Sequence, residues 1–178
     1  MSAGLEIEVK KISFSVPGVP VPGGSKKAWP IHARGCPGGR YRNRGPCVCR
    51  PRIGLADVSG ERGKYWRTLV AASAVKAMHE AMITELWRGA IWLEMIFYMP
   101  RPKQHFGTGK NQFIVRNSAP SYHVTKPDLT KLLRSAEDAL TNVLWADDCQ
   151  IVDTRVRKTF ARKTPGVVIN ASLIEMSQ

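Results

Sequence analysis

The sequence predicts a single α+β domain over residues 1–178, with a mixed or antiparallel sheet packed by two helices in the order β-α-β-α-β-β. The first observation behind this prediction is a set of short segments with alternating or continuous apolar residues, which are typical of strands. The second is a pair of longer segments with apolar residues at helical spacing. The third is length, because 178 residues without internal repeats suffice for one domain with a hydrophobic core.

The first half of the chain contributes a strand, a helix and a central strand. Alternating apolar residues over 12–16 predict the first strand, which ends in the proline- and glycine-rich stretch 17–27. Helical spacing of apolar residues predicts the first helix over 61–83. The apolar and aromatic run 90–99, ended by Pro100, is predicted to be the central strand.

The second half contributes a helix and two strands. The second helix is predicted over roughly 128–143, with Pro127 and Asp128 in its first turn. Its predicted buried face consists of Leu129, Leu132, Leu133, Ala136, Leu140 and Val143. A loop with a short strand at 113–115 precedes this helix, and strands over 152–160 and 166–174 follow it.

Residues 28–60 are predicted to be a loop insertion that carries many glycines, arginines and cysteines. A structureless loop of this length is unusual in a compact domain, so we expect it to be functional or held by a bound group. Its arginines are Arg34, Arg40, Arg42, Arg44, Arg50 and Arg52.

The charge of the chain indicates a polyanionic partner. The sequence has 27 Lys and Arg against 14 Asp and Glu, a formal net charge of +13 and a pI near 10.0. This charge favours nucleic acid, with an anionic membrane surface as the weaker alternative. No apolar run approaches the roughly 20 residues of a spanning helix, and residues 1–10 lack the apolar core of a signal peptide. We therefore expect a cytoplasmic protein with no membrane partner.

An acidic island, residues 128–153, interrupts this basic sequence. It contains two cations, Lys131 and Arg134, and six carboxylates: Asp128, Glu137, Asp138, Asp147, Asp148 and Asp153. A polyanion attracted to the rest of the chain would be repelled here unless a divalent cation intervened, and metal-dependent phosphodiester chemistry uses such an arrangement. The alternative is structural. Asp128 would stabilise a helix start by about 0.3–1 kcal/mol, and aspartates at 147 and 148 suit a turn.

Several motifs resemble those of a known family. Lys-Pro-Asp-Leu at 126–129, Leu-Leu-Arg at 132–134, Asp-Ala-Leu-Thr at 138–141 and Trp-Ala-Asp-Asp-Cys-Gln-Ile-Val at 145–152 resemble the RusA family of Holliday-junction resolvases, especially its phage-type members. Similar features upstream are Val-Pro-Gly-Val-Pro-Val-Pro at 16–22, Pro-Arg-Pro-Lys at 100–103 and Tyr-His-Val-Thr at 122–125. Together these motifs cover most of the chain except residues 28–60.

The resemblance implies a RusA-like fold and a Mg²⁺-dependent, homodimeric endonuclease that cuts four-way (Holliday) or branched DNA junctions in a bacterial or phage-infected cell. It implies that Asp128 and Asp148 are catalytic aspartates that bind Mg²⁺, and that Arg134 is the basic residue near the chemistry. Asp147 is a candidate for a further Mg²⁺ ligand. These roles agree with the residue types, since carboxylates bind Mg²⁺ and a cation stabilises charge that develops on a phosphate.

Thr130 departs from the family motif, which generally has an aspartate at this position. A negatively charged ligand is therefore missing, although the Thr130 hydroxyl is a neutral group able to hold a metal-bound water. Glu137 is on the same helical face but about 10 Å further along the axis, so we do not expect it to replace the missing carboxylate.

The predicted loop contains His32, Cys36, Cys47 and Cys49, a combination of ligands that suits a tetrahedral zinc site. A structural Zn²⁺ would explain how a glycine-rich loop is ordered. The spacing is not a standard one, and the alternative is an arginine-rich arm whose thiols have no role. Cys149 is expected to be a buried thiol at the start of a strand.

Basic residues outside the island are expected to contact DNA phosphates. The predicted DNA-binding residues are Lys26, Lys27, Arg101, Lys103, Lys131, Arg155 and Arg157. Two other functions stay open: a non-catalytic branched-DNA-binding protein that lost its chemistry through Thr130, and an RNA-binding module, which the charge allows but which no aromatic recognition motif supports.

Overall fold

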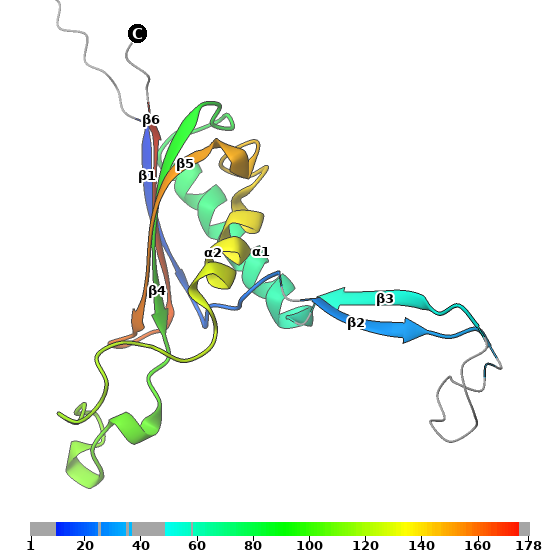
Figure 1. Cartoon of the computed structure of the whole chain (residues 1–178). Coiled ribbons are helices and arrows are strands. Elements are labelled where there is room, and N and C mark those ends of the chain that lie inside the picture. The colour runs from blue at the N-terminus through cyan, green and yellow to red at the C-terminus, as the bar shows by residue number, and fades with distance from the viewer. Residues whose placement is uncertain (1–9, 25, 35, 37–48, 58, 175–178) are drawn as a thin grey trace, which may run out of the picture.

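The computed structural model describes residues 10–24, 26–34, 36, 49–57 and 59–174 (Figure 1). Its main sheet has four strands in the order β1-β6-β4-β5. The strands are β1 (Lys11–Pro17), β4 (Ala90–Met99), β5 (Ile151–Phe160) and β6 (Gly166–Ile174). Strand β6 pairs antiparallel with β1 and β4, whereas β5 runs parallel to β4. The predicted mixed sheet in a single α+β domain is confirmed.

Two helices, α1 (Gly60–Glu80) and α2 (Leu129–Leu140), cover one face of this sheet (Figure 1). Alternate residues of β4 point toward the helices and are almost completely buried: Ile91, Leu93, Met95, Phe97 and Met99. Trp66 and Val70 from α1 and Leu132 and Leu140 from α2 complete the core. The predicted apolar face of the second helix is confirmed, because its other members pack against the same core.

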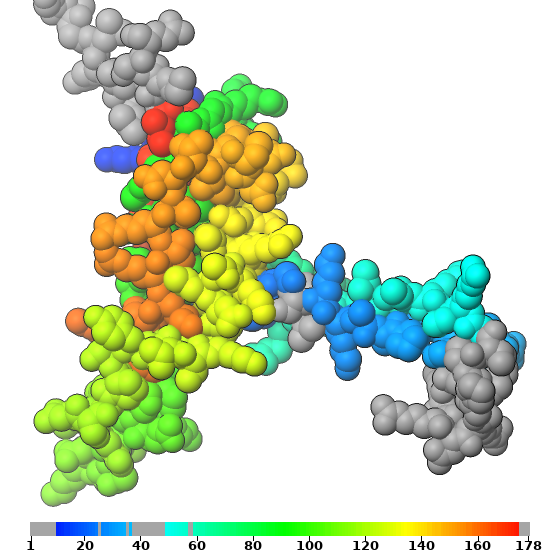
Figure 2. Space-filling view, in the orientation of Figure 1, coloured from blue at the N-terminus to red at the C-terminus, as the bar shows by residue number. Residues whose placement is uncertain are grey.

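A two-stranded hairpin takes up both ends of the predicted loop over 28–60. Strands β2 (Lys26–Ile31) and β3 (Arg52–Asp57) pair antiparallel with Trp29 opposite Gly54. The loop prediction is therefore wrong for these residues. Pro30 lies within β2, and both strands of a hairpin are edge strands, where a residue without an N–H is tolerated. Figures 1 and 2 show that the hairpin extends away from the body of the molecule.

The connection from β4 to α2 contains two short 3₁₀ helices, η1 (Lys103–His105) and η2 (Gly109–Asn111). The short strand predicted at 113–115 is reduced to one isolated bridge, between Phe106 and Val115. A third 3₁₀ helix, η3 (Asp148–Gln150), precedes β5. Neither α-helix within the described residues is long and apolar enough to cross a membrane.

Candidate active site

Asp128 is the residue that precedes α2, and contacts from the sheet hold it there. Its backbone is extended, with φ −69° and ψ 142°. Pro127 and Asp128 therefore lie just before the first helical turn, and the prediction that they lie within that turn is wrong. The Lys158 ammonium on β5 donates hydrogen bonds to the carbonyl oxygens of Thr125 and Pro127, at 2.8 and 2.7 Å. These bonds fix the segment that leads into α2 to the edge of the sheet.

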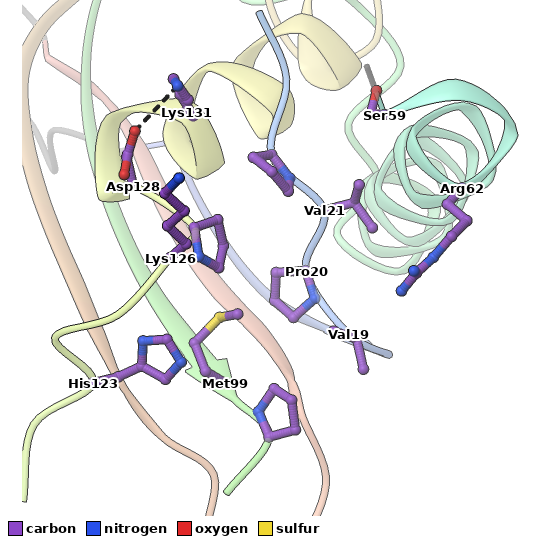
Figure 3. Close-up of a pocket in the computed structure, with 13 residues that line it drawn as sticks. Val19, Pro20, Val21, Ser59, Arg62, Met99, His123, Lys126, Asp128 and Lys131 are labelled. Carbon is purple, nitrogen blue, oxygen red and sulfur yellow. Dashed lines mark ion pairs between the residues drawn. The ribbon is translucent and has the colours of Figure 1, made fainter. Parts of the chain in front are cut away.

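A cleft of about 660 Å³ lies beside Asp128 (Figure 3). The Asp128 side chain is 55% exposed, and its Oδ2 atom lies 3.1 Å from Lys131 Nζ. Lys126 and Arg62 also line the cleft, Arg62 from α1 on the side opposite Asp128. An exposed ion pair contributes only about 0–1 kcal/mol, so Asp128 is able to exchange Lys131 for another cation at little cost. The cleft thus presents one carboxylate among several positive charges.

The loop beside this cleft is anchored on Phe160, which is buried at the end of β5. The rings of His105 and His123 pack against Phe160 with centroid distances of 5.2 and 5.0 Å. The Arg101 guanidinium lies 4.3 Å from the same ring centroid and donates a hydrogen bond to the Pro120 carbonyl. Burial lowers the pKa of His123, and the charge of Lys158 lowers it further. The lowered pKa favours the neutral form of His123, whose ring packs against Phe160.

Asp147 and Asp148 are presented by a turn with a dense hydrogen-bond network. The Asp147 carboxylate accepts a hydrogen bond from the Cys149 N–H at 2.9 Å, and this bond lowers the pKa of Asp147. The Gln150 Oε1 atom accepts from the N–H groups of Ala146 and Asp147, and its Nε2 atom donates to the carbonyls of Trp87 and Gly89. Asp147 thus caps the turn, while Asp148 is exposed and accepts none of these hydrogen bonds.

Cys149 is exposed, so the prediction of a buried thiol is wrong. It lies within η3, before β5 begins, where the turn projects into solvent. A hydrogen bond to Asp147 raises the pKa of the Cys149 thiol. The thiol is therefore protonated at neutral pH, which disfavours a role as a nucleophile.

Glu137 lies close enough to Asp148 for the charges of the two carboxylates to influence each other. It is half-buried on α2. Burial raises the pKa of Glu137, the charges of Asp148 and Asp138 raise it further, and the charge of Arg134 lowers it. The excess of negative charge around Glu137 and Asp148 is the kind of environment that a divalent cation stabilises. Helical spacing could not predict that Glu137 and Asp148 lie near each other, because the turn after α2 brings them together.

The acidic residues form two groups at opposite ends of α2. Asp128 precedes the helix and Glu137 lies nine residues on, roughly 13 Å along the axis. Within the described residues, the grouping of His, Cys, Asp and Glu side chains that brings three together at metal-binding distance includes none of Asp128, Asp147 or Asp148. The assignment of these aspartates to one shared Mg²⁺ stays a prediction.

Arg134 lies against the glycine turn that follows β1. A Cβ atom on Gly24 would meet Arg134 Cδ at 3.2 Å, and one on Gly23 would meet Ser135 Cα at 3.2 Å. The Gly23 N–H also donates to the Lys131 carbonyl at 2.9 Å. The proline- and glycine-rich stretch is thus packed on α2, where Gly24 lies against the exposed Arg134.

The other predicted DNA-binding residues are distributed over three elements. Lys26 and Lys27 are exposed at the start of β2, and Lys103 is exposed in η1. Arg155 and Arg157 are exposed on β5, where Arg155 Nε lies 3.9 Å from Glu94 on β4. Their contact with DNA stays a prediction.

Of the predicted zinc ligands, His32, Cys36 and Cys49 come together at the far end of the hairpin. The fourth, Cys47, lies outside the described residues.

Replacing Glu137 by glutamine tests the charge environment of the acidic turn. A raised folded-state pKa means that the folded chain favours protonated Glu137, so this stabilisation is present at acid pH and is lost as pH rises through that pKa. In metal-free buffer near pH 7, we expect Glu137→Gln to raise the melting temperature by on the order of a degree or two. The difference should vanish below the unfolded-state pKa of about 4.3. Glu85→Gln, at an exposed position, is the control; an equal rise there would refute the explanation.

The surface around α2 combines exposed carboxylates with several cations. The sequence model of the family described as endodeoxyribonuclease RusA matches residues 49–171, and the chain belongs to this family. The match contains both Asp128 and Asp148. The chain is also similar to a protein of Bacillus subtilis (strain 168) described as uncharacterized protein YqaN, with 27% identity over 152 residues that cover 85% of this chain and 89% of the relative.

Proposed function

We propose that this protein is a Mg²⁺-dependent, structure-specific endonuclease that hydrolyses phosphodiester bonds in four-way (Holliday) or branched DNA junctions. The observation that carries the proposal is the match to the RusA family over 49–171, which includes both exposed aspartates. The net charge of +13 supports a nucleic-acid substrate.

The donor set fits Mg²⁺. Asp128 and Asp148 present exposed carboxylate oxygens, which are the ligand atoms that Mg²⁺ prefers. Burial raises the pKa of Glu137, and the charge of Asp148 raises it further, so negative charge gathers beside Asp148. Asp147 is a weaker candidate because its Oδ1 atom caps η3. When bound, Mg²⁺ lowers the pKa of a coordinated water and stabilises negative charge on the phosphate.

The cations next to the carboxylates bind and orient the DNA. Arg134 lies close enough to Glu137 to shift its pKa, so it places a permanent positive charge at the acidic turn. Lys131 pairs with Asp128, and it would be free to contact a phosphate if Asp128 held Mg²⁺ instead. Arg62 and Lys126 extend the positive surface along the cleft beside Asp128.

We further propose that the active form is a homodimer in which Asp128 of one copy and Asp148 of the other serve the same site. Their separation along α2 in one chain supports this arrangement. Mixing Asp128→Asn and Asp148→Asn proteins, each inactive alone, should restore cleavage up to about a quarter of the natural rate, because random pairing makes half of the dimers mixed and each has one intact site. No recovery after subunit exchange, verified with differently tagged copies, would contradict this arrangement.

The proposed activity is tested by incubating the protein with a labelled four-way junction and with linear duplexes of the same sequences. We expect cleavage of the junction in Mg²⁺, little cleavage of the duplexes, and none of either in EDTA. Equal cutting of junction and duplex would remove the structure-specific part of the proposal.

A non-catalytic branched-DNA-binding protein is the second candidate, and Thr130 is the observation that favours it. Thr130 is exposed in the first turn of α2, two residues after Asp128, where the family motif has an aspartate. This function predicts preferential junction binding without cutting at any Mg²⁺ concentration, so the same assay distinguishes the two candidates.

A further inference from the structure

Three side chains meet at the end of the β2–β3 hairpin that is remote from the body of the protein. His32 directly follows β2, and Cys49 lies three residues before β3 begins. The Cys49 Sγ atom is 3.5 Å from His32 Nδ1, and the Cys36 Sγ atom is 3.9 Å from the same nitrogen. All three ligand atoms lie within 4.8 Å of one another, and all three residues are partly buried.

These distances match the edges of a tetrahedral zinc site. Zinc–nitrogen bonds of about 2.0–2.1 Å and zinc–sulfur bonds of about 2.3 Å place nitrogen and sulfur about 3.6 Å apart, and two sulfurs about 3.8 Å apart. The two observed nitrogen–sulfur distances lie close to the first of these values. Thiolate and imidazole ligands in tetrahedral geometry favour zinc over the harder Mg²⁺.

The hairpin also lacks the support that the rest of the fold receives from its core. Ile53 and Leu55 on β3 are 74% and 62% exposed, and Trp29 and Ile31 on β2 are 42% and 48% exposed. An isolated two-stranded hairpin is at best marginally stable in water. A metal ion that joins the residue after β2 to the segment before β3 would hold the two strands together at this end.

We propose that His32, Cys36 and Cys49 bind a structural zinc ion that closes the far end of the hairpin. This zinc site is separate from the acidic residues around α2. The proposal does not depend on the proposed nuclease activity. Its ligands are two thiolates and the Nδ1 atom of His32. The sequence offers Cys47 as a fourth ligand, and that assignment stays a prediction.

The test is metal analysis of the full-length, untagged protein, purified without chelators. We expect about one zinc ion per chain in the natural protein, and loss of most of it in Cys36→Ser and Cys49→Ser. Cys149→Ser is the matched control, because it removes an exposed thiol outside the cluster. It should keep the full zinc content.

A second measurement guards against loss of zinc through general unfolding. Natural protein reconstituted with Co²⁺ should show thiolate-to-cobalt charge-transfer absorption, which should be retained in Cys149→Ser and weakened in Cys36→Ser. The proposal would be overturned by natural protein without zinc and without thiolate–cobalt absorption, or by unchanged zinc content in both cluster variants. It would also be overturned by an unreduced mass lower by two hydrogens, which indicates a disulfide in place of the metal.

Discussion

Asp148→Asn and Asp128→Asn should each abolish junction cleavage while junction binding stays intact or becomes tighter. The substitution keeps the shape of the side chain and removes the charge that binds Mg²⁺ and repels phosphate. Changes to residues that merely support a metal ligand cost about 10–100-fold, so loss of a ligand should cost more. Cleavage rates under single-turnover conditions and gel-shift affinities in EDTA measure the two effects separately.

Asp153→Asn is the matched control for these variants. Asp153 is an exposed carboxylate on β5 that belongs to the same acidic island but not to the proposed site. It should change the cleavage rate little. If Asp148→Asn or Asp128→Asn cuts at the natural rate, that residue is not a metal ligand.

Trp145→Ala should both destabilise the fold and impair the site. Trp145 is completely buried between α2 and η3, and its Nε1–H donates to Thr141 Oγ1 at 3.3 Å. Truncating such a residue costs about 3–5 kcal/mol of unfolding free energy, a large part of the 5–15 kcal/mol of a typical domain. Because Trp145 anchors the turn that presents Asp148, cleavage should fall even at low temperature, where the variant is folded. Urea unfolding and cleavage rates provide the two measurements.

Trp66→Ala distinguishes the loss of stability from the direct effect on the cleavage site. Trp66 is equally buried, but it lies on α1 rather than next to the acidic turn. We expect a similar loss of stability with a much smaller loss of cleavage by the folded fraction. A parallel loss of cleavage in both variants would show that Trp145 acts through global stability alone.

The helices and strands whose buried residues recur at regular spacing could be predicted from the sequence. The bounds of β4 and β6 agree with the predicted strands, because their apolar runs end at turn residues such as Pro100. The core face of α2 follows from helical spacing, since Leu132, Ala136 and Leu140 must face the sheet together. The family motifs are concentrated in and around α2, so this part of the fold and the family were predicted together.

Features created by tertiary contacts could not be predicted. The hairpin was missed because Pro30 and Gly54 are poor strand residues, and cross-strand pairing tolerates them only at an edge. The proximity of Glu137 to Asp148 depends on the buried turn at Leu144 and Trp145, which no period describes.

The most direct test of the central claim starts from a preformed complex of the natural protein with a labelled four-way junction in EDTA. Excess Mg²⁺ is then added together with unlabelled junction, so that each complex reacts once. We predict that cut product appears from the bound junction only after Mg²⁺ is added. A complex that forms normally and never cuts, at any Mg²⁺ concentration, would contradict the assignment as an endonuclease.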